Sequence, residues 1–396
     1  MITPEEALRR VLQHAHPLSP RTLDIHHAHG MTLAKEVKCQ DNLPRFDQSA
    51  MDGYAIRYQD IAKASPGRPV FLKLIGEIQA GSQSYPKLQK GCAIQISTGA
   101  RIPPGSDTVI MQENCKIQES VIAIHGAEDL EANIRYRGEE IQKGKIALSK
   151  GSRLNPGSLA WLASMGIQKI SVYPQPRIGL LRSGNELIDG KKNLKPYQIR
   201  DAHGISLPLA MKEIGIEPNV LPIVSDDLRK TKSAFSKLLA TSDIAITTGG
   251  ISVGKHDLFQ EIAKSFGIKE IFYKISQKPG KPLYFGKMGS KLWFGLPGNP
   301  VSALVCYYIY IRPALLKIMN LPLPEWFQAK AGESFPTHPN RVQFLRGHYK
   351  NGMVTFAEKQ GSHCLGGFAK ANVLSKIPCS SKPGKMGNKL SCVRLF

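Results

Sequence analysis

The chain has 396 residues, with 53 lysines and arginines against 31 aspartates and glutamates, and its net charge is 53 − 31 = +22. This length predicts two to four domains, and a hydrophobic content of 42% is enough to build their cores. The positive charge favours acidic partners such as phosphates, oxyanions or nucleic acid. Because the basic residues are scattered, with no basic arm and no aromatic-interleaved basic stripe, nucleic acid is the weaker choice.

The seven cysteines are odd in number and contain no Cys-x-x-Cys pair, which argues against a disulfide framework or a zinc site and favours a reducing cytosol. The N-terminus lacks the apolar core of a signal peptide. The uncharged stretch 292–311 is interrupted by Gly295, Pro297, Gly298 and Pro300, which predicts a buried strand, a turn and a core-facing helix. We therefore expect a soluble cytoplasmic protein without a membrane partner.

The N-terminal part predicts one helix followed by a β-rich region. Thr3-Pro4-Glu5-Glu6 is a helix-capping sequence, so a helix should run to about His14. Residues 43–55 are too polar and too irregular for a helix or an ordinary strand, and they favour a ligand loop or, alternatively, a linker into a domain. Short strands follow at 70–75, 92–97, 108–111 and 121–124, as in a small inserted β domain.

The next part of the chain predicts an α/β domain. A helix is expected over 154–165, and after Pro176 strands alternate with helices. Strands are expected at 178–181, 220–224, 244–246, 271–275, 283–285 and 292–294, and the last helix at about 300–319. Such alternation predicts a mostly parallel sheet with ligands at the carboxyl ends of its strands. From Pro322 onward, short strands at 343–345, 354–356 and 373–377 predict a compact C-terminal β domain.

The stretch from Asp243 to Asp257 reads as strand, glycine-rich turn and helix, with Asp257 at the expected helix N-cap. One interpretation is a phosphate cradle, because such a turn crowds backbone N–H groups around an anion. The other is a tight turn that needs glycine for conformational reasons alone.

Four loops follow strands of the expected sheet, so they should gather at one edge, and they cover 183–186, 225–227, 247–257 and 297–300. They bring carboxylates of Glu186, Asp226 and Asp257 together with glycine amides. This mixture suits a divalent cation with a phosphate. Nearby positive charge that fits a second anion comes from Lys274, Lys278 and Lys281.

At this point the sequence resembles the molybdopterin molybdenumtransferases, the MoeA and gephyrin E-domain family, over nearly its whole length. The motifs that carry the resemblance are Phe46-Asp47-Gln48-Ser49-Ala50-Met51-Asp52-Gly53-Tyr54-Ala55, Ser97-Thr98-Gly99-Ala100, Arg137-Gly138-Glu139-Glu140-Ile141, Thr248-Gly249-Gly250-Ile251-Ser252-Val253-Gly254 with Asp257, Lys278-Pro279-Gly280-Lys281-Pro282 and Gly295-Leu296-Pro297-Gly298-Asn299-Pro300-Val301-Ser302-Ala303. Together these motifs are far more specific than a glycine loop alone.

The resemblance implies a multidomain α/β plus β fold with four domains. These are an elongated domain from segments 1–43 and 139–172, an inserted β-rich domain at 44–138, an adenylyltransferase-like α/β domain at 173–320 with a mostly parallel sheet, and a C-terminal β-barrel-like domain at 321–396. It also implies a homodimer whose sites lie between subunits.

The implied reaction inserts molybdate into adenylylated molybdopterin and yields molybdenum cofactor and AMP, with Mg²⁺ or a similar divalent cation. The implied partners are a molybdopterin adenylyltransferase that donates the substrate and molybdoenzymes or their chaperones that accept the product.

Matched position by position, the resemblance implies catalytic roles for Asp52, Thr98, Glu140, Glu186, Asp226, Asp257, Lys274 and Lys278. It implies substrate contacts for Gly249, Gly250, Ser252, Gly254, Pro297, Pro300, Arg346 and Ser362. The cation would lie on Glu186, Asp226 and Asp257.

Three departures from the family pattern are visible. Ser183-Gly184-Asn185-Glu186 has an amide where the family has a carboxylate, and Glu140 replaces aspartate. The serine-asparagine pair expected after Asp201 is Ala202-His203. None removes the main constellation, so we expect an active, diverged member.

Two rival functions remain. The first is molybdopterin adenylylation, the chemistry associated with the related α/β domain, and the second is a gephyrin-like scaffold that binds a partner peptide.

Overall fold

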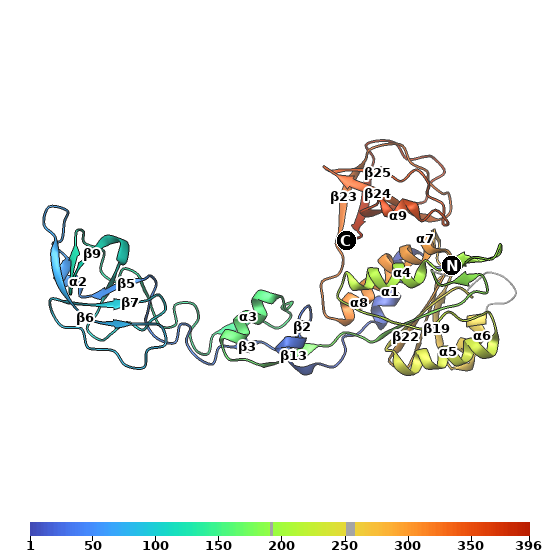
Figure 1. The fold of residues 1–396 in the computed structure, drawn as a ribbon. Coiled ribbons are helices and arrows are strands. Elements are labelled where there is room, and N and C mark those ends of the chain that lie inside the picture. Colours follow the sequence, from blue (N-terminus) through green and yellow to red (C-terminus); the bar gives the residue numbers. More distant parts are fainter. Residues whose placement is uncertain (191–192, 251–257) are drawn as a thin grey trace. The chain divides into compact units, whose positions relative to one another are not determined.

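The computed structural model describes residues 1–190, 193–250 and 258–396, and it divides into two compact units (Figure 1). Unit 1 comprises Met1–Leu23, Ala28–Ala34 and Ser171–Phe396, and unit 2 comprises Asp24–His27 and Lys35–Ile170. A three-stranded sheet has the order β1 (Arg21–Asp24), β13 (Lys169–Tyr173), β2 (Thr32–Leu33).

Unit 2 is built around a six-stranded sheet with the order β8-β5-β7-β6-β10-β9. Its strands are β5 (Gly53–Ile56), β6 (Val70–Ile78), β7 (Cys92–Ile96), β8 (Thr108–Met111), β9 (Cys115–Gln118) and β10 (Val121–Ile124). Two short ladders pair β11 (Ile134–Arg135) with β4 (Gln48–Ser49) and β12 (Ile146–Leu148) with β3 (Val37–Lys38). The helical elements are η1 (Ile25–His27), α2 (Tyr58–Ile61), η2 (Gln112–Asn114) and α3 (Pro156–Ser164).

The expectation that residues 43–55 avoid strand structure is wrong, because β5 lies inside the sheet between β8 and β7. All four of its residues are buried, so both faces are covered and the sequence shows no alternation of polar and apolar residues. Gly53 is required there, since a Cβ would lie 2.0 Å from the carbonyl oxygen of Ile110.

Unit 1 contains a six-stranded sheet with the order β17-β14-β18-β22-β21-β19. Its strands are β14 (Ile178–Arg182), β17 (Asn219–Val220), β18 (Ile244–Thr248), β19 (Lys269–Tyr273), β21 (Tyr284–Met288) and β22 (Lys291–Leu296). Strands β17, β14, β18 and β22 run parallel, and β21 is antiparallel to both of its neighbours, β22 and β19. The expected mostly parallel sheet is confirmed. A small parallel pair joins β15 (Leu187–Ile188) to β16 (Ile199–Arg200).

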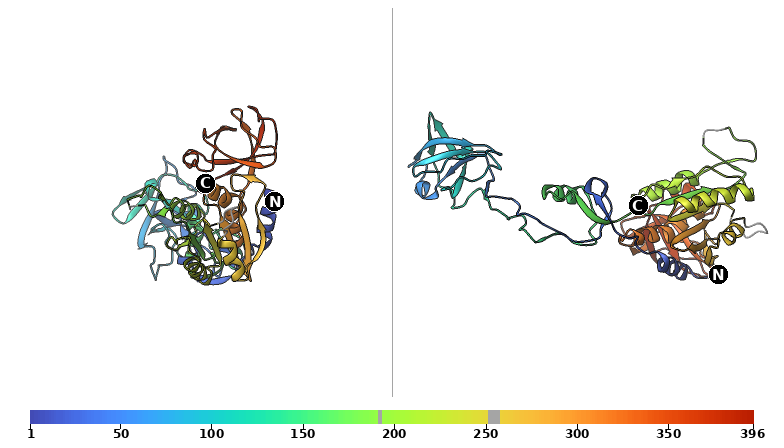
Figure 2. Two further views of the ribbon diagram at one scale, coloured as in Figure 1. Left: turned by 90° about the vertical axis from the view of Figure 1, so that its right-hand side faces the viewer. Right: turned by 90° about the horizontal axis from the view of Figure 1, so that it is seen from below.

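Helices cover both faces of this sheet (Figures 1 and 2). The helices are α1 (Pro4–His14), α4 (His203–Lys212), α5 (Leu228–Thr241), α6 (Leu258–Ser265), α7 (Pro300–Cys306), the π-helical η3 (Tyr307–Ile311) and α8 (Arg312–Ile318). Alternate strand residues enter different cores: Ile244 and Ile246 pack with α1, α4, α7 and α8, whereas Ala245 packs with α5 and α6.

One expected strand of this sheet is shorter in the structure, and the uncharged stretch near its end forms the expected core helix. The strand expected over 220–224 ends after Val220, because Pro222 has no backbone N–H to continue the ladder. The run Pro300–Ile318 is long and apolar enough to cross a membrane, and it is the one such helix among the described residues. Since 89% of its apolar window is buried within the fold, it is a core helix, as expected.

The C-terminal strands close into a barrel in the order β24-β25-β23-β27-β26, with β26 pairing back to β24. The strands are β23 (Trp326–Ala331), β24 (Val342–Lys350), β25 (Met353–Phe356), β26 (Val373–Ile377) and β27 (Lys389–Arg394), and α9 (Gly366–Ala369) lies beside them. The two-residue strand β20 (Gln277–Lys278) joins β24 in parallel. The barrel lies on the side of the sheet that carries α4 and α8 (Figure 1). The predicted α/β plus β fold class is confirmed.

Candidate functional site

Four loops of unit 1 meet at the carboxyl ends of β14, β17, β18 and β22. The Ser183 N–H donates to the carbonyl oxygen of Thr248 at 3.0 Å, and the Gly184 N–H donates to that of Val224 at 3.1 Å. On the other side, a Cβ on Gly298 would lie 3.8 Å from the Cα of Gly249. The expected gathering of the loops at one sheet edge is confirmed for their described residues.

The turn after β18 can accept only glycine at two successive positions. Gly249 and Gly250 have φ values of 80° and 61°, in the left-handed region. A Cβ on Gly249 would lie 2.2 Å from the carbonyl oxygen of Ser183, and one on Gly250 would lie 2.6 Å from the Phe259 ring. The fold alone therefore explains both glycines.

Two buried hydroxyls at this turn have no hydrogen-bond partner among the described residues. These are Ser183 Oγ, at the end of β14, and Thr248 Oγ1, at the end of β18. A buried hydroxyl without a partner is costly, so a hydrogen bond from either hydroxyl to a polar ligand atom or a water would be favourable.

The acidic residues Glu186 and Asp226 lie on neighbouring loops that Asn185 ties together. The Asn185 N–H donates to Asp226 Oδ2 at 3.3 Å, and Asn185 Oδ1 accepts from the Asp226 N–H at 3.1 Å. A Cβ on Gly184 would lie 2.7 Å from Glu186 Oε2, so the Glu186 carboxylate folds back over this glycine. The amide at position 185 thus links the two loops.

The donor atoms at this edge suit a hard divalent cation. Mg²⁺ is commonly bound through one or two carboxylates together with substrate phosphates, and Glu186 and Asp226 are both exposed without an ion pair among the described residues. The described ranges contain no group of three or more His, Cys, Asp or Glu side chains arranged for a metal. The third expected ligand, Asp257, lies outside the described residues, as do Ser252 and Gly254. The three-carboxylate site therefore stays a prediction.

The departure at His203 has a clear structural role. Its ring Nε2 lies 2.9 Å from the carbonyl oxygen of Gly298, so a neutral ring that carries its hydrogen on Nε2 donates to the loop after β22. Burial lowers the pKa of His203, against the opposing effects of this bond and of Asp201. Asp201 accepts from the His203 N–H at 2.9 Å and pairs at 2.5 Å with Arg182, which is itself buried. This cluster fixes the start of α4 against the loops.

The two lysines expected to bind anions flank a short loop at the end of the sheet. Lys274 follows β19 with φ 72°, which is unusual for a residue with a side chain, and its Nζ lies 4.9 Å from the Tyr273 ring centroid. Lys278 is exposed and lies in β20, opposite Gln343 of β24. A hydrogen bond from the Ile275 N–H to the Lys281 carbonyl oxygen at 2.9 Å closes the loop 275–281, which contains Lys278 and directly follows Lys274.

The barrel meets the α/β domain at the loop that holds Pro297 and Pro300. Asn299 Nδ2 donates to Ser362 Oγ at 3.3 Å, so the predicted Ser362 lies beside this loop. Pro300 is the first residue of α7, where its missing N–H costs nothing.

Arg346 holds the loop that carries Ser362. Its side chain is 1% exposed, and all its N–H groups point at protein oxygens within 3.4 Å. The acceptors are Gln360 Oε1 and the carbonyl oxygens of Lys359, Gly361 and Cys364. Arg346 therefore fixes the position of this loop, and direct substrate contact stays a prediction that this geometry does not favour.

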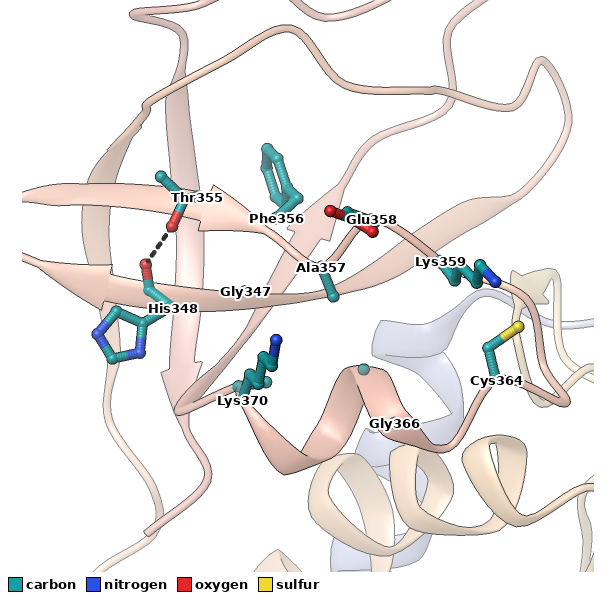
Figure 3. Close-up of a pocket in the computed structure, with 12 residues that line it drawn as sticks. Gly347, His348, Thr355, Phe356, Ala357, Glu358, Lys359, Cys364, Gly366 and Lys370 are labelled. Atoms are coloured by element: carbon teal, nitrogen blue, oxygen red, sulfur yellow. Dashed lines mark hydrogen bonds between the residues drawn. The ribbon is translucent and has the colours of Figure 1, made fainter.

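A cavity of about 780 Å³ opens beside the same loop (Figure 3). Figure 3 shows Glu358, Lys359 and Cys364 on the loop and Lys370 on the segment after α9. His348 lies at another side, where its carbonyl oxygen accepts from Thr355 Oγ1 at 3.4 Å. Gly347, which directly follows the predicted site residue Arg346, also lines this cavity.

In unit 2, the predicted pair Asp52 and Thr98 is brought together. Asp52 Oδ1 accepts from the Thr98 N–H at 2.7 Å and from Thr98 Oγ1 at 3.0 Å. The bond from the Thr98 backbone, followed by that from its hydroxyl, lowers the pKa of Asp52. The site therefore holds an exposed, ionised carboxylate at neutral pH.

Glu140 lies in the turn that follows β11, and this turn is hydrogen-bonded to residues 43–47 of unit 2. The Glu140 N–H donates to the carbonyl oxygen of Leu43 at 3.0 Å, and the Arg137 N–H donates to Asp47 Oδ1 at 2.7 Å. The Glu140 side chain is exposed. The role of Glu140 in catalysis stays a prediction.

Sequence reasoning missed three residues that shape these loops. Gln277 is wholly buried behind Lys278, Asn299 reaches Ser362, and Asp47 accepts from the Arg137 turn. The only sequence signal for Gln277 is that it is a polar residue next to a predicted site residue. Asn299 and Asp47 lie inside family motifs, but no separate role was predicted for either.

Family models match most of the chain. The MoeA N-terminal region (domain I and II) matches residues 2–166, a probable molybdopterin binding domain matches 179–317, and the MoeA C-terminal region (domain IV) matches 328–388.

Whole-chain relatives agree with these models. A molybdopterin molybdenumtransferase of Haemophilus influenzae is 34% identical over 94% of this chain and 93% of its own. One of Nostoc sp. is 32% identical over 90% of this chain and 84% of its own. A crystal structure of a molybdopterin biosynthesis MoeA protein from Pyrococcus horikoshii has a TM-score of 0.78 at 27% identity, with 100% of both chains covered. The chain therefore belongs to the MoeA family, whose named relatives are molybdopterin molybdenumtransferases.

Proposed function

We propose that the chain is a molybdopterin molybdenumtransferase, which inserts molybdate into adenylylated molybdopterin and releases AMP in molybdenum cofactor biosynthesis. The observation that carries this proposal is the convergence of the loops after β14, β17, β18 and β22, which brings exposed carboxylates close to the glycine turn. Family membership over the whole chain gives that site its substrate class.

The lysines have the charge to attract molybdate, a weakly basic dianion. Lys278 is exposed and lies within the closed loop 275–281, and the half-buried Lys274 directly precedes that loop. The amides of Gly249 and Gly250 would hold the phosphate side of the pterin. Ser362 and the loop from Pro297 to Pro300 would bound the substrate on the barrel side.

A divalent cation such as Mg²⁺ would be held by Glu186, Asp226 and Asp257. When bound, it would supply positive charge that polarises the pyrophosphate of the adenylylated substrate. Without it, the hydrogen bonds of Asn185 and Gly184 still link the loops that carry the two described carboxylates.

The ionised Asp52 and its partner Thr98 would complete the site from the second subunit of a homodimer. A molybdopterin adenylyltransferase would donate the substrate, and molybdoenzymes or their chaperones would accept the product in the cytoplasm. The seven cysteines, all of them described and all free, support a reducing compartment.

The alternative activity, adenylylation of molybdopterin, is not favoured. The matches to the MoeA N-terminal and C-terminal regions extend beyond the molybdopterin-binding domain on both sides. Incubation with molybdopterin and ATP tests the alternative directly, because only an adenylyltransferase would release pyrophosphate. A gephyrin-like scaffold has no supporting observation of its own here.

The direct test supplies adenylylated molybdopterin and molybdate to the purified chain and measures AMP release and the activation of a cofactor-free molybdoenzyme. Lys278→Ala and Asp226→Asn should each lower the rate by about tenfold or more. Lys330→Ala removes an exposed lysine from β23 and should leave the rate unchanged.

The same variants can be tested in cells. The wild-type gene should restore molybdoenzyme activity in a strain that lacks its own insertase, and Lys278→Ala should not. Failure of the wild-type chain in both assays would overturn the proposed function.

A further inference from the structure

A buried glutamine lies directly before Lys278. Gln277 is 0% exposed, although a polar amide in a core is costly unless its hydrogen bonds are made. Its Nε2 donates to the Pro279 carbonyl oxygen at 3.0 Å and faces Cys306 Sγ at 3.8 Å. Its Oε1 accepts from the hydroxyl of Tyr310. The amide is therefore fully used, and one of its bonds holds the peptide that follows Lys278.

The loop is fitted closely around this amide. Gly280 has φ 88°, and a Cβ there would lie 2.7 Å from Gln277 Nε2 and 2.8 Å from Cys306 Sγ. Cys306 Sγ also lies 3.8 Å from the carbonyl oxygen of Gly280. Two successive loop carbonyls thus face buried side chains, which restricts the path of the chain after Lys278.

The backbone before Lys278 is fixed as well. The Gln277 N–H donates to the Ile275 carbonyl oxygen at 2.9 Å, and Gln277 pairs with Val342 in the β20–β24 ladder. Both neighbours of Lys278 are held, so only its side chain is free to move. A cation held in this way loses less conformational entropy when it binds an anion.

Tyr310 connects this arrangement to the core helix. It lies in the π-helical η3, is 0% exposed and donates its hydroxyl hydrogen to Gln277. Burial raises the pKa of Tyr310 well above its ordinary value, so the hydroxyl remains a donor. Short π-helical segments are often found near functional sites.

We propose that Gln277 is a positioning residue for Lys278: its bond to the Pro279 carbonyl sets the loop that presents this lysine to molybdate. The inference rests on the proposed function for the identity of the anion. Tyr310 orients the glutamine and its hydroxyl bonds to Oε1, not to a loop carbonyl, so we expect that hydroxyl to contribute mainly to stability.

The test compares variants that break different bonds of the same amide. Gln277→Met keeps the length and apolar volume of the side chain but loses both bonds. Tyr310→Phe loses only the bond that does not reach the loop. The double variant leaves no unpaired Tyr310 hydroxyl, so it should recover part of the stability lost in Gln277→Met, while the Pro279 carbonyl still lacks its donor.

Two measurements are made on the full chain. Calorimetric titration with molybdate gives a Kd, and the insertion assay gives KM for molybdate and kcat. For Gln277→Met and the double variant we expect Kd and KM to rise by roughly tenfold with kcat within about twofold. Tyr310→Phe should keep Kd within about twofold of wild type despite a lower Tm.

Equal Kd values for Gln277→Met and wild type would overturn the inference, and so would an equal rise in Tyr310→Phe. If Gln277→Met does not fold, the double variant decides by the same criteria. Lys278→Ala is the reference: an unchanged Kd there removes Lys278 from the anion site and overturns this inference. A wild-type chain that binds molybdate but never inserts it would refute the proposed function alone, since Kd still tests the positioning.

Discussion

The guanidinium of Arg346 is buried and has no carboxylate partner among the described residues. Its acceptors are an amide oxygen and three backbone carbonyl oxygens, and its Cζ lies 5.7 Å from the Phe368 ring centroid. Burial lowers the pKa of Arg346, yet arginine keeps its charge because its ordinary pKa is so high. The planar fork, rather than the charge alone, therefore organises the loop at residues 359–364.

Arg346→Lys should show this dependence on geometry. A lysine has three hydrogens on one nitrogen and cannot reach all four acceptors, so we expect a loss of about 2–3 kcal/mol in the free energy of unfolding. Urea titration followed by fluorescence measures this loss. Arg341→Lys changes a half-buried arginine with no such set of acceptors and should stay within about 0.5 kcal/mol.

Lys274 combines a charge with a backbone conformation that disfavours side chains. At φ 72° a glycine is relaxed, whereas an alanine keeps the strain of the left-handed region. Lys274→Gly should therefore be more stable than Lys274→Ala by about 1 kcal/mol, although both lose the positive charge equally. Thermal unfolding of the two variants measures the difference, and an alanine variant as stable as the glycine one would show that the backbone is not strained.

His203 makes the stability of the fold depend on pH. Burial lowers its pKa below the ordinary value of 6.5, so the folded chain favours the neutral ring and the unfolded chain binds the extra proton. This stability is fully present above the unfolded pKa and is lost as the pH falls below it. Between about pH 7.5 and about pH 5.5 the wild type should thus lose more stability than His203→Asn, which keeps a donor but does not titrate.

Urea unfolding of both proteins at the two pH values measures this difference. Burial also lowers the pKa of His14, which adds its own pH dependence to both proteins. The comparison is therefore repeated with His14→Gln present in both proteins. An identical pH dependence in wild type and His203→Asn would contradict the prediction.

At the scale of single elements, the turn after β18 is limited by contact with its neighbours. Gly249→Ala should cost roughly 3 kcal/mol, because strain at positive φ adds to a collision with the Ser183 carbonyl oxygen. Gly267→Ala is the matched control, since Gly267 has φ 67° but nothing within 4 Å of a Cβ, and it should cost about 1 kcal/mol. Chemical denaturation gives both values, and similar costs would mean that the loop can move aside.

The sequence predicted elements well where local signals are strong. Thr3 caps α1 by accepting from the Glu6 N–H at 3.2 Å, and α1 ends at His14 as expected. The carboxylate of Glu6, however, binds Arg9 and Arg10 instead of returning to the cap. Alternating strands and helices likewise predicted the sheet, because its strands have long apolar runs.

Elements without such signals were missed. Strand β5 is buried on both faces, and β23 and β27 were not predicted at all, because a barrel strand depends on partners far away in the sequence. For the site, motifs predicted the Asp52–Thr98 pair and the loops of unit 1. They could not show that Arg346 is enclosed by carbonyl oxygens, since this depends on the path of a loop.

At the scale of the whole molecule, the proposed homodimer can be tested by mixing inactive variants. If each site takes Asp52 from one subunit and Lys278 from the other, a heterodimer of Asp52→Ala and Lys278→Ala subunits has one intact site. Random exchange would then restore about a quarter of wild-type activity. If both residues come from the same subunit, mixing restores nothing. Sedimentation of the wild type should give twice the chain mass of 43.6 kDa.

The pairing of β20 with β24 means that the barrel cannot be treated as a removable module. The backbone that carries Lys278 is paired with a barrel strand, so truncation before β23 would remove the pairing partner of the anion loop. It would also expose apolar residues of α8 that pack against the barrel. An engineered protein without the barrel would therefore need another strand to pair with β20.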